Sequence, residues 1–172
     1  MDGNVRTGAI GKIMTFADFC AELFGNKILI AGVLAWFIAQ VFKCINNVIT
    51  EGKFSIERLF GDGGMPSGHS ATVTSVATMA GLICGVGSVE FAIAAILAII
   101  VMHDAMGVRL QTGIQAKKIN DLTLRLDRMF NMNVTGEEKL KELIGHTPLQ
   151  VIAGFALGII VAVVYYVITR GV

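Results

Sequence analysis

The sequence Gly63-Gly64-Met65-Pro66-Ser67-Gly68-His69-Ser70-Ala71 predicts a sharp turn between two apolar segments. Glycine has no Cβ, so backbone N–H groups in such a turn can approach an anion closely. Pro66 suits the first turn of a helix, and Ser67 can cap that helix. His69 would then stand at a helix N-terminus, where the partial positive charge favours phosphate. The alternative is an ordinary glycine–proline turn with a solvent-exposed histidine.

The composition excludes several classes of protein. Of the 172 residues, 54% are hydrophobic and 16% are charged, and the mean hydropathy is +0.69. A soluble domain of this length is rarely so apolar. The formal net charge of +1 provides no field that would attract nucleic acid. The three cysteines show no disulfide framework or metal-ligand spacing, and we expect no cofactor. We therefore predict an integral, multi-pass, all-α membrane protein with a single domain over residues 1–172.

Four apolar segments predict a bundle of about four transmembrane helices, at 28–49, 70–86, 89–106 and 149–168. Residues 1–26 predict an amphipathic helix in the membrane interface or, alternatively, a short helix packed on the bundle. Residues 110–145 form a hydrophilic insertion before the last span. It is expected to be helical over 115–130, and Thr135 with Glu138 has the pattern of a capping box.

The second half of the first span carries an unusual polar face. Gln40, Lys43, Asn46 and Asn47 recur at intervals that place several of them on one side of a helix. Polar groups in a spanning helix are expected to face the protein interior, and an ionisable one is a candidate for function. The alternative for Lys43 is a side chain that reaches towards the membrane interface.

With four spans, the turn before His69, the end of the third helix at Arg109 and the segment with His146 lie on one side of the membrane. That side carries most of the lysines and arginines, so the positive-inside rule predicts that it is cytoplasmic. Two imidazoles, several cations and a glycine-rich turn suit a phosphomonoester at the membrane surface. One imidazole can attack phosphorus while the other protonates the leaving oxygen. The alternative for His146 is a histidine at a helix cap.

Three ordered blocks of sequence resemble a known family. Met65–Ser70 contains the Pro-Ser-Gly-His motif of the type 2 phosphatidic acid phosphatases and vanadium haloperoxidases. Asp104–Arg109 and Leu143–Val151 are similar to the two halves of the third motif of that superfamily. From Ile28 onward, the chain resembles the divergent branch of small membrane proteins related to acid phosphatase and haloperoxidase.

The resemblance implies a role for each matching residue. His146 is similar to the nucleophile that forms a phosphohistidine, and His69 to the general acid. Arg109 resembles a phosphate clamp, while Ser67 and the Gly68 N–H would stabilise the equatorial oxygens.

The first motif of the family pairs a lysine with an arginine. Lys43 and Arg58 are the candidates here, and Lys53 is a substitute for Lys43 because the separation is wider than usual.

The sequence departs from the family pattern in two places. The family has an aspartate four residues after the nucleophilic histidine, and this chain has Gln150, which can accept the ring N–H but supplies no charge. Asp104 is a candidate for the missing role, or it forms an ion pair. The second departure is the insertion 110–145, which is interpreted as a lid, a substrate gate or a homodimer contact.

Together, these features predict a phosphatase that hydrolyses a lipid phosphomonoester or pyrophosphate through a phosphohistidine, without metal. Candidate substrates are phosphatidylglycerol phosphate, phosphatidic acid and polyprenyl phosphates. One alternative is a non-catalytic phospholipid-binding or scaffold protein, suggested by Gln150. Another is a small transporter, suggested by Lys43 and Asp104 within apolar segments, although no internal symmetry supports it.

Overall fold

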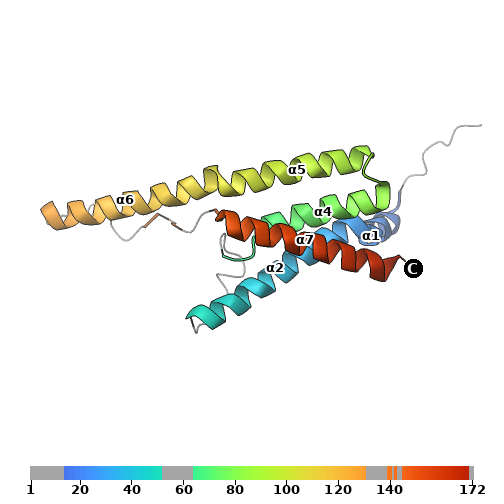
Figure 1. The fold of residues 1–172 in the computed structure, drawn as a ribbon, viewed down its shortest axis with the longest axis horizontal. Helices are drawn as coiled ribbons and strands as arrows, with labels where there is room; N and C mark the ends of the chain where they lie inside the picture. The colour runs from blue at the N-terminus through green and yellow to red at the C-terminus, as the bar shows by residue number, and fades with distance from the viewer. Residues whose placement is uncertain (1–13, 52–63, 131–138, 141, 143–144, 171–172) are drawn as a thin grey trace, which may run out of the picture.

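The computed structural model describes residues 14–51, 64–130, 139–140, 142 and 145–170. All regular secondary structure in these ranges is helical, as predicted (Figure 1). The helices are α1 (Phe16–Gly25), α2 (Lys27–Glu51), α4 (Gly68–Cys84), α5 (Val89–Met106), α6 (Val108–Phe130) and α7 (Pro148–Thr169). The bounds of α2, α4, α5 and α7 lie within about two residues of the expected segments.

Three stretches of helix are long and apolar enough to cross a membrane: Lys27–Ile49, Val89–Phe130 and Pro148–Thr169. The fourth expected span corresponds to α4, which has 17 residues and is not among them. At 1.5 Å per residue, α4 is about 26 Å long, slightly less than the thickness of a hydrocarbon core.

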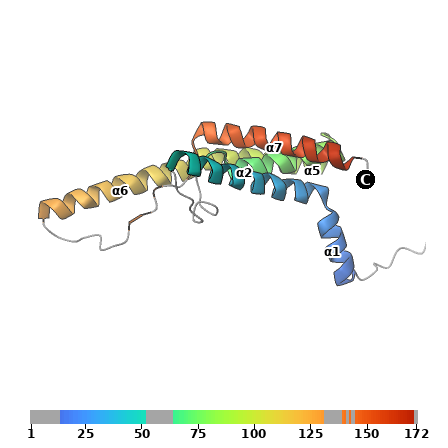
Figure 2. The same ribbon diagram turned by 90° about the horizontal axis from the view of Figure 1, so that it is seen from below.

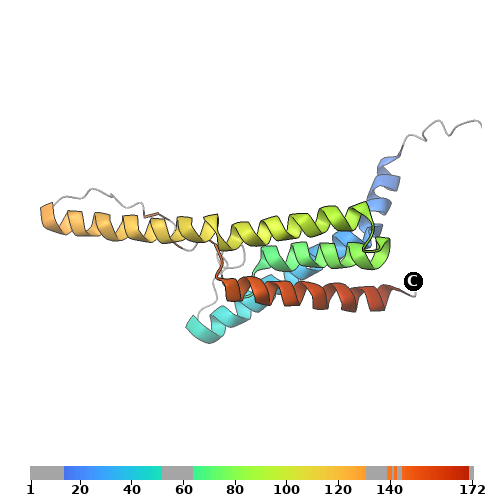
Figure 3. The same ribbon diagram turned by 45° about the horizontal axis from the view of Figure 1, so that its top comes forward.

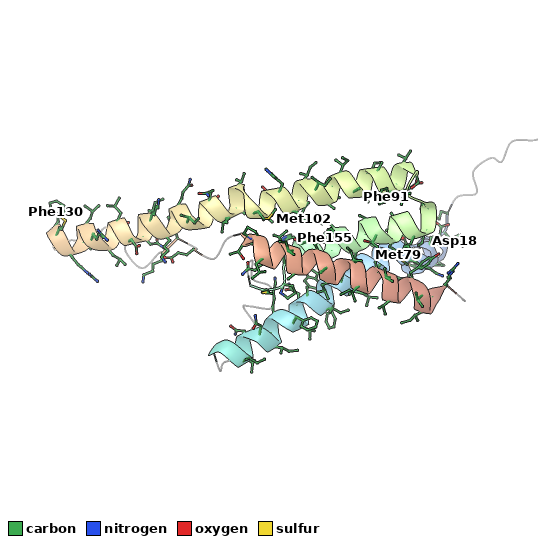
Figure 4. All side chains as sticks on the ribbon, viewed as in Figure 1. Asp18, Met79, Phe91, Met102, Phe130 and Phe155 are labelled. Carbon is green, nitrogen blue, oxygen red and sulfur yellow. The ribbon has the colours of Figure 1, made fainter. Side chains whose placement is uncertain are left out.

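The centre of the bundle is α4, which packs against α2, α5 and α7 (Figure 3). Most of its buried residues are small, and the largest is Met79, labelled in Figure 4. Small side chains allow helix backbones to approach each other, which favours association where lipid provides no hydrophobic driving force. Its Ser75 hydroxyl also donates a hydrogen bond of 2.9 Å to the Ala31 carbonyl of α2.

The closest helix contact is between α4 and α7, and two glycines on α7 make it. Gly154 and Gly158 are one turn apart and both are buried. A Cβ at Gly154 would overlap the Ser67 carbonyl oxygen, and a Cβ at Gly158 would lie 2.5 Å from the Ala71 carbonyl oxygen. The two helices therefore touch backbone to backbone, the geometry typical of small-xxx-small pairs in membranes.

Helix α5 packs its alanines against α4 and leads directly into α6. Ala94 and Ala98 form a cluster with Ala77 and Ala80 of α4. The helix ends at Met106 with Gly107 as its C-cap. Helix α6 begins at Val108 and continues roughly along the same direction, out of the bundle (Figure 1, Figure 3). The expected helix over 115–130 is present, but it begins about seven residues earlier than predicted.

At the other end of the molecule, α1 turns away from α2 and buries none of its residues (Figure 2). This arrangement contradicts the interpretation of a short helix packed on the bundle. A capping box begins α1, in which the Thr15 hydroxyl and backbone N–H donate to Asp18 and lower the pKa of its carboxyl group. Residues 1–13, and the Thr135–Glu138 capping box, lie outside the described residues.

The α4–α7 contact predicts the effect of enlarging Gly158. Gly158→Val should force the two helices apart and destabilise the detergent-solubilised protein by about 1–3 kcal/mol, seen as a lower midpoint in thermal unfolding. Ala156→Val is the matched control, because Ala156 is exposed on the same helix and should leave the midpoint unchanged. Equal midpoints for the two variants would contradict the close contact.

Candidate functional site

The candidate site begins at the N-terminus of α4. Ser67 is the N-cap residue: its hydroxyl accepts a hydrogen bond of 3.3 Å from the Ser70 N–H and one of 3.0 Å from the Ser70 hydroxyl. Both serines are fully buried. The preceding turn uses Gly64 with a φ of +84°, a conformation that favours glycine. Ser67 caps α4 as predicted, but Pro66 precedes the cap, so the expected position in the first helical turn is wrong.

The N-terminus of α7 lies directly beside this cap. The Ser67 N–H donates a hydrogen bond of 2.9 Å to the Gln150 carbonyl in the first turn of α7. Together with the glycine contact below it, this bond brings the two helix N-termini, and their partial positive charges, to one place.

The long insertion leaves the bundle and returns to the same point. The His146 N–H donates a hydrogen bond of 3.0 Å to the Ala105 carbonyl at the end of α5. Gly145, with a φ of +89°, lies so close to the backbone of Arg109 and Leu110 that no Cβ could fit. The two halves of the split motif, far apart in the sequence, are therefore joined backbone to backbone.

His146 is 2% exposed, and its ring is oriented by Gln150. The Gln150 Oε1 atom accepts a 3.0 Å hydrogen bond from the Thr147 N–H and lies 3.3 Å from the His146 Nδ1 atom. A backbone N–H can only donate, so the Gln150 atom that faces it is the oxygen. An amide oxygen can only accept, so the neutral imidazole carries its proton on Nδ1 and its lone pair on Nε2.

The second imidazole stands next to the first. The ring centroids of His69 and His146 are 5.9 Å apart, and the ring planes make an angle of 62°. His69 is exposed whereas His146 is buried. The pair thus has one ring inside the bundle and one at its surface.

Helix α2 contributes a buried cation to the same place. Lys43 is only 7% exposed, and its Nζ atom lies 3.7 Å from the position that a Cβ on Gly68 would occupy. This burial contradicts the alternative in which Lys43 reaches out to the interface. Asn47 is buried on the same face, whereas Asn46 is exposed.

Gln40 belongs to the predicted polar face of α2 but was not predicted to be a site residue. Its side chain is 5% exposed, and its Oε1 atom would lie 4.0 Å from a Cβ on Gly68. Within the described part of the chain, this oxygen has no hydrogen-bond partner. The sequence feature that could have predicted this position is the separation of three residues between Gln40 and Lys43, which puts both side chains on one helix face.

Arg109 and Asp104 form an ion pair at the junction of α5 and α6. The Arg109 Nε atom lies 2.6 Å from the Asp104 Oδ2 atom, and both side chains are partly exposed. The ion-pair interpretation of Asp104 is thus observed, and its role as a carboxylate for His146 stays a prediction.

Arg58 and its neighbour Lys53 lie outside the described residues. Among the residues that are described, no group of three or more His, Cys, Asp or Glu side chains could hold a metal ion.

Comparison with known proteins supports the resemblance seen in the motifs. The Divergent PAP2 family matches residues 24–161. The uncharacterized membrane protein YuiD of Bacillus subtilis (strain 168) is 38% identical over 151 residues, which cover 83% of this chain and 96% of that protein. No solved structure matches the chain. With its three candidate spans, the chain is a multi-pass membrane protein, and it belongs to the divergent PAP2 family.

Proposed function

We propose that this protein is a membrane phosphatase that hydrolyses the phosphomonoester or pyrophosphate headgroup of a lipid through a phosphohistidine on His146. The observation that carries the proposal is the convergence of two imidazoles, 5.9 Å apart, at the N-terminus of α4 beside a buried lysine. Family membership supports the same reaction class, because many relatives of this superfamily are phosphatases.

The phosphate group would be held by α4 and α2 together. The first-turn N–H groups of α4, including that of Gly68, point along the helix axis, where they would donate to a bound phosphate. The Ser67 hydroxyl and the Lys43 ammonium lie beside them. Arg109, and Arg58 from outside the described residues, are the proposed guanidinium partners. These charges would stabilise the equatorial oxygens as negative charge shifts in the transition state.

The chemistry then takes two steps. The His146 Nε2 lone pair attacks phosphorus, and the bond to the leaving oxygen breaks as His69 donates a proton to that oxygen. A water molecule next attacks the phosphohistidine, and His69 takes a proton from the water as the P–N bond breaks. Gln150 keeps the His146 Nδ1–H in place through both steps. The side chains and backbone N–H groups of the protein, with one water molecule, supply every group in this scheme, so the scheme calls for no metal.

The location of the site supports a lipid substrate. The end of α5 and the starts of α4 and α7 meet where apolar helices end, and in the proposed topology lipid phosphates would lie at this depth. In the proposed topology α4 is a fourth span, and the excess of lysine and arginine on the site side makes that side cytoplasmic. Phosphatidylglycerol phosphate, phosphatidic acid and polyprenyl phosphates are the candidate substrates.

One observation favours a second candidate function. The group that orients His146 is a neutral amide, and the nearby Asp104 carboxylate is held by Arg109. A phospholipid-binding or scaffold protein with a degenerate pocket would need the cations and helix N-termini but no fast chemistry. Binding of lipid phosphates without release of inorganic phosphate would support this alternative.

Replacing His146 tests the proposed nucleophile. His146→Ala and the bulkier His146→Gln should each reduce phosphate release from lipid phosphates by at least about 10³-fold, because each removes the ring nitrogen that attacks phosphorus. The assay is run on solubilised protein with EDTA, and thermal unfolding checks that each variant is folded. His103→Ala is the control, since His103 is an exposed histidine at the end of α5. Turnover by folded His146 variants would remove this residue from the nucleophile role.

Replacing Gln150 tests how the ring is oriented. Gln150→Glu has the same shape, can still accept from the Thr147 N–H, and adds a negative charge against the His146 Nδ1–H. It should raise kcat by about 10-fold or more, because it stabilises positive charge on the ring. Gln150→Leu removes the acceptor and should lower kcat. If neither variant changes kcat, the contact between Gln150 and His146 has no part in the reaction.

A further inference from the structure

Helix α6 extends beyond the bundle and carries a surface that the proposed reaction does not use. It contacts α5 at their junction and packs against no other described helix. Figure 1 and Figure 3 show it continuing the direction of α5, and Phe130, labelled in Figure 4, marks its far end. Between 117 and 128 it carries six charged residues, Lys117, Lys118, Asp121, Arg125, Asp127 and Arg128. Because a segment with six charges is incompatible with a hydrocarbon environment, this part of α6 stands outside the membrane.

An apolar stripe runs along this charged helix. Ile119, Leu122, Leu126 and Met129 follow one another at intervals of three, four and three residues, the spacing of a coiled-coil seam. Ile119, Leu122 and Met129 are 50%, 57% and 75% exposed. Leu126, between them, is partly buried. No described helix other than α5, at the junction, packs against α6, so the three exposed side chains have no helix partner within the described part of the chain.

The returning chain covers a different face of α6. The Asn120 side chain donates hydrogen bonds of 2.9 Å to the Leu140 carbonyl and to the Glu142 carboxylate. At 100° per residue, Asn120 lies roughly 120–140° around the helix from the centre of the stripe. The contact that ties Leu140 and Glu142 to α6 therefore lies away from the three exposed residues of the stripe.

We propose that the stripe is the seam of a parallel coiled coil between the α6 helices of two copies of this chain. Ile119 and Leu126 occupy the a positions and Leu122 and Met129 the d positions of this seam. The first heptad, with Ile119 at a and Leu122 at d, has the β-branched and leucine pattern that favours two-stranded pairing.

The membrane fixes the direction of pairing. Two copies inserted with the same orientation project their α6 helices from the same face, so the helices can meet only side by side and parallel. The flanking charges agree with this direction. Lys118 and Arg125 occupy the g positions, and in a parallel pair they face Thr123 and Phe130 of the second copy, which are uncharged. An antiparallel pair would bring Lys118 against Arg125 and place like charges together.

The membrane surface is a less suitable occupant for the stripe. Within the stretch Val89–Phe130, α5 is the apolar part and the charged α6 continues in the same direction, so the stripe on α6 points sideways into water rather than down onto the bilayer. A seam of about two heptads is marginal for free peptides. Confinement of both copies to one membrane raises their effective concentration, so a short seam suffices.

Disulfide crosslinking in native membranes tests the proposal directly. In a chain with its three cysteines, Cys20, Cys44 and Cys84, replaced by serine, one new cysteine is introduced at a time. Leu122→Cys places two thiols across the seam, and oxidation by copper phenanthroline should convert them to a disulfide-linked dimer. Lys117→Cys, on the opposite face, should give at least about 10-fold less dimer.

A second substitution separates seam contacts from chance collisions. Leu126→Lys, added to Leu122→Cys, should abolish the crosslink because it places a charge in the seam. Leu124→Lys is the matched control, since Leu124 is an exposed leucine on the opposite face and should leave the crosslink intact.

Two results would overturn the pairing. Equal crosslinking at 117 and 122 would indicate random collision. A solvent-sensitive fluorophore attached to the thiol of the Leu122→Cys variant could instead report a lipid environment. That signal, without a crosslink at the same position, would show that the membrane covers the stripe. Neither result depends on phosphatase activity, so the outcome is independent of the proposed function.

Discussion

The backbone contact between α4 and α7 is the constraint on which the rest of the structure depends. A membrane gives helices little hydrophobic reason to associate, so they associate where small residues allow many close contacts. Gly154 and Gly158 supply this closeness on α7, and the small residues of α4 supply the other half. The contact sets the position of α4 relative to α7 along the helix axes. As a consequence, the two helices start at the same level. The Ser67–Gln150 hydrogen bond is a direct result.

The site is therefore assembled from helix ends rather than from one continuous motif. The start of α4 provides the cap and His69, the start of α7 provides Gln150, and the end of α5 holds the backbone of His146. Helix α2 differs, because it supplies Lys43 from its side. Each group is attached to a rigid element, which is the arrangement that preorganises a site for charge that develops in a reaction.

Much of the fold could be predicted because hydropathy and small residues mark membrane helices clearly. The Pro-Ser-Gly-His turn identified the family, and the periodicity around Lys43 predicted its burial. Other features depend on contacts between segments that are distant in sequence. Gly107 looks like a helix stop, yet the chain resumes as α6 after one residue, which no local propensity indicates. Gln40 was predicted to share the polar face of Lys43, but its place in the site was not predicted, because nothing in its own segment shows that Gly68 lies against it.

The close backbone contact of Gly145 with Arg109 and Leu110 allows the length of the insertion 110–145 to differ between related proteins. Both ends of the insertion 110–145 are fixed to each other, so the length of the insertion does not affect the position of His146. Lengthening such a loop also costs little entropy. The insertion can therefore vary without changing the bundle: relatives could carry a short hairpin, a longer helix or a whole extra domain at this point. The candidate site would keep the same geometry in every case.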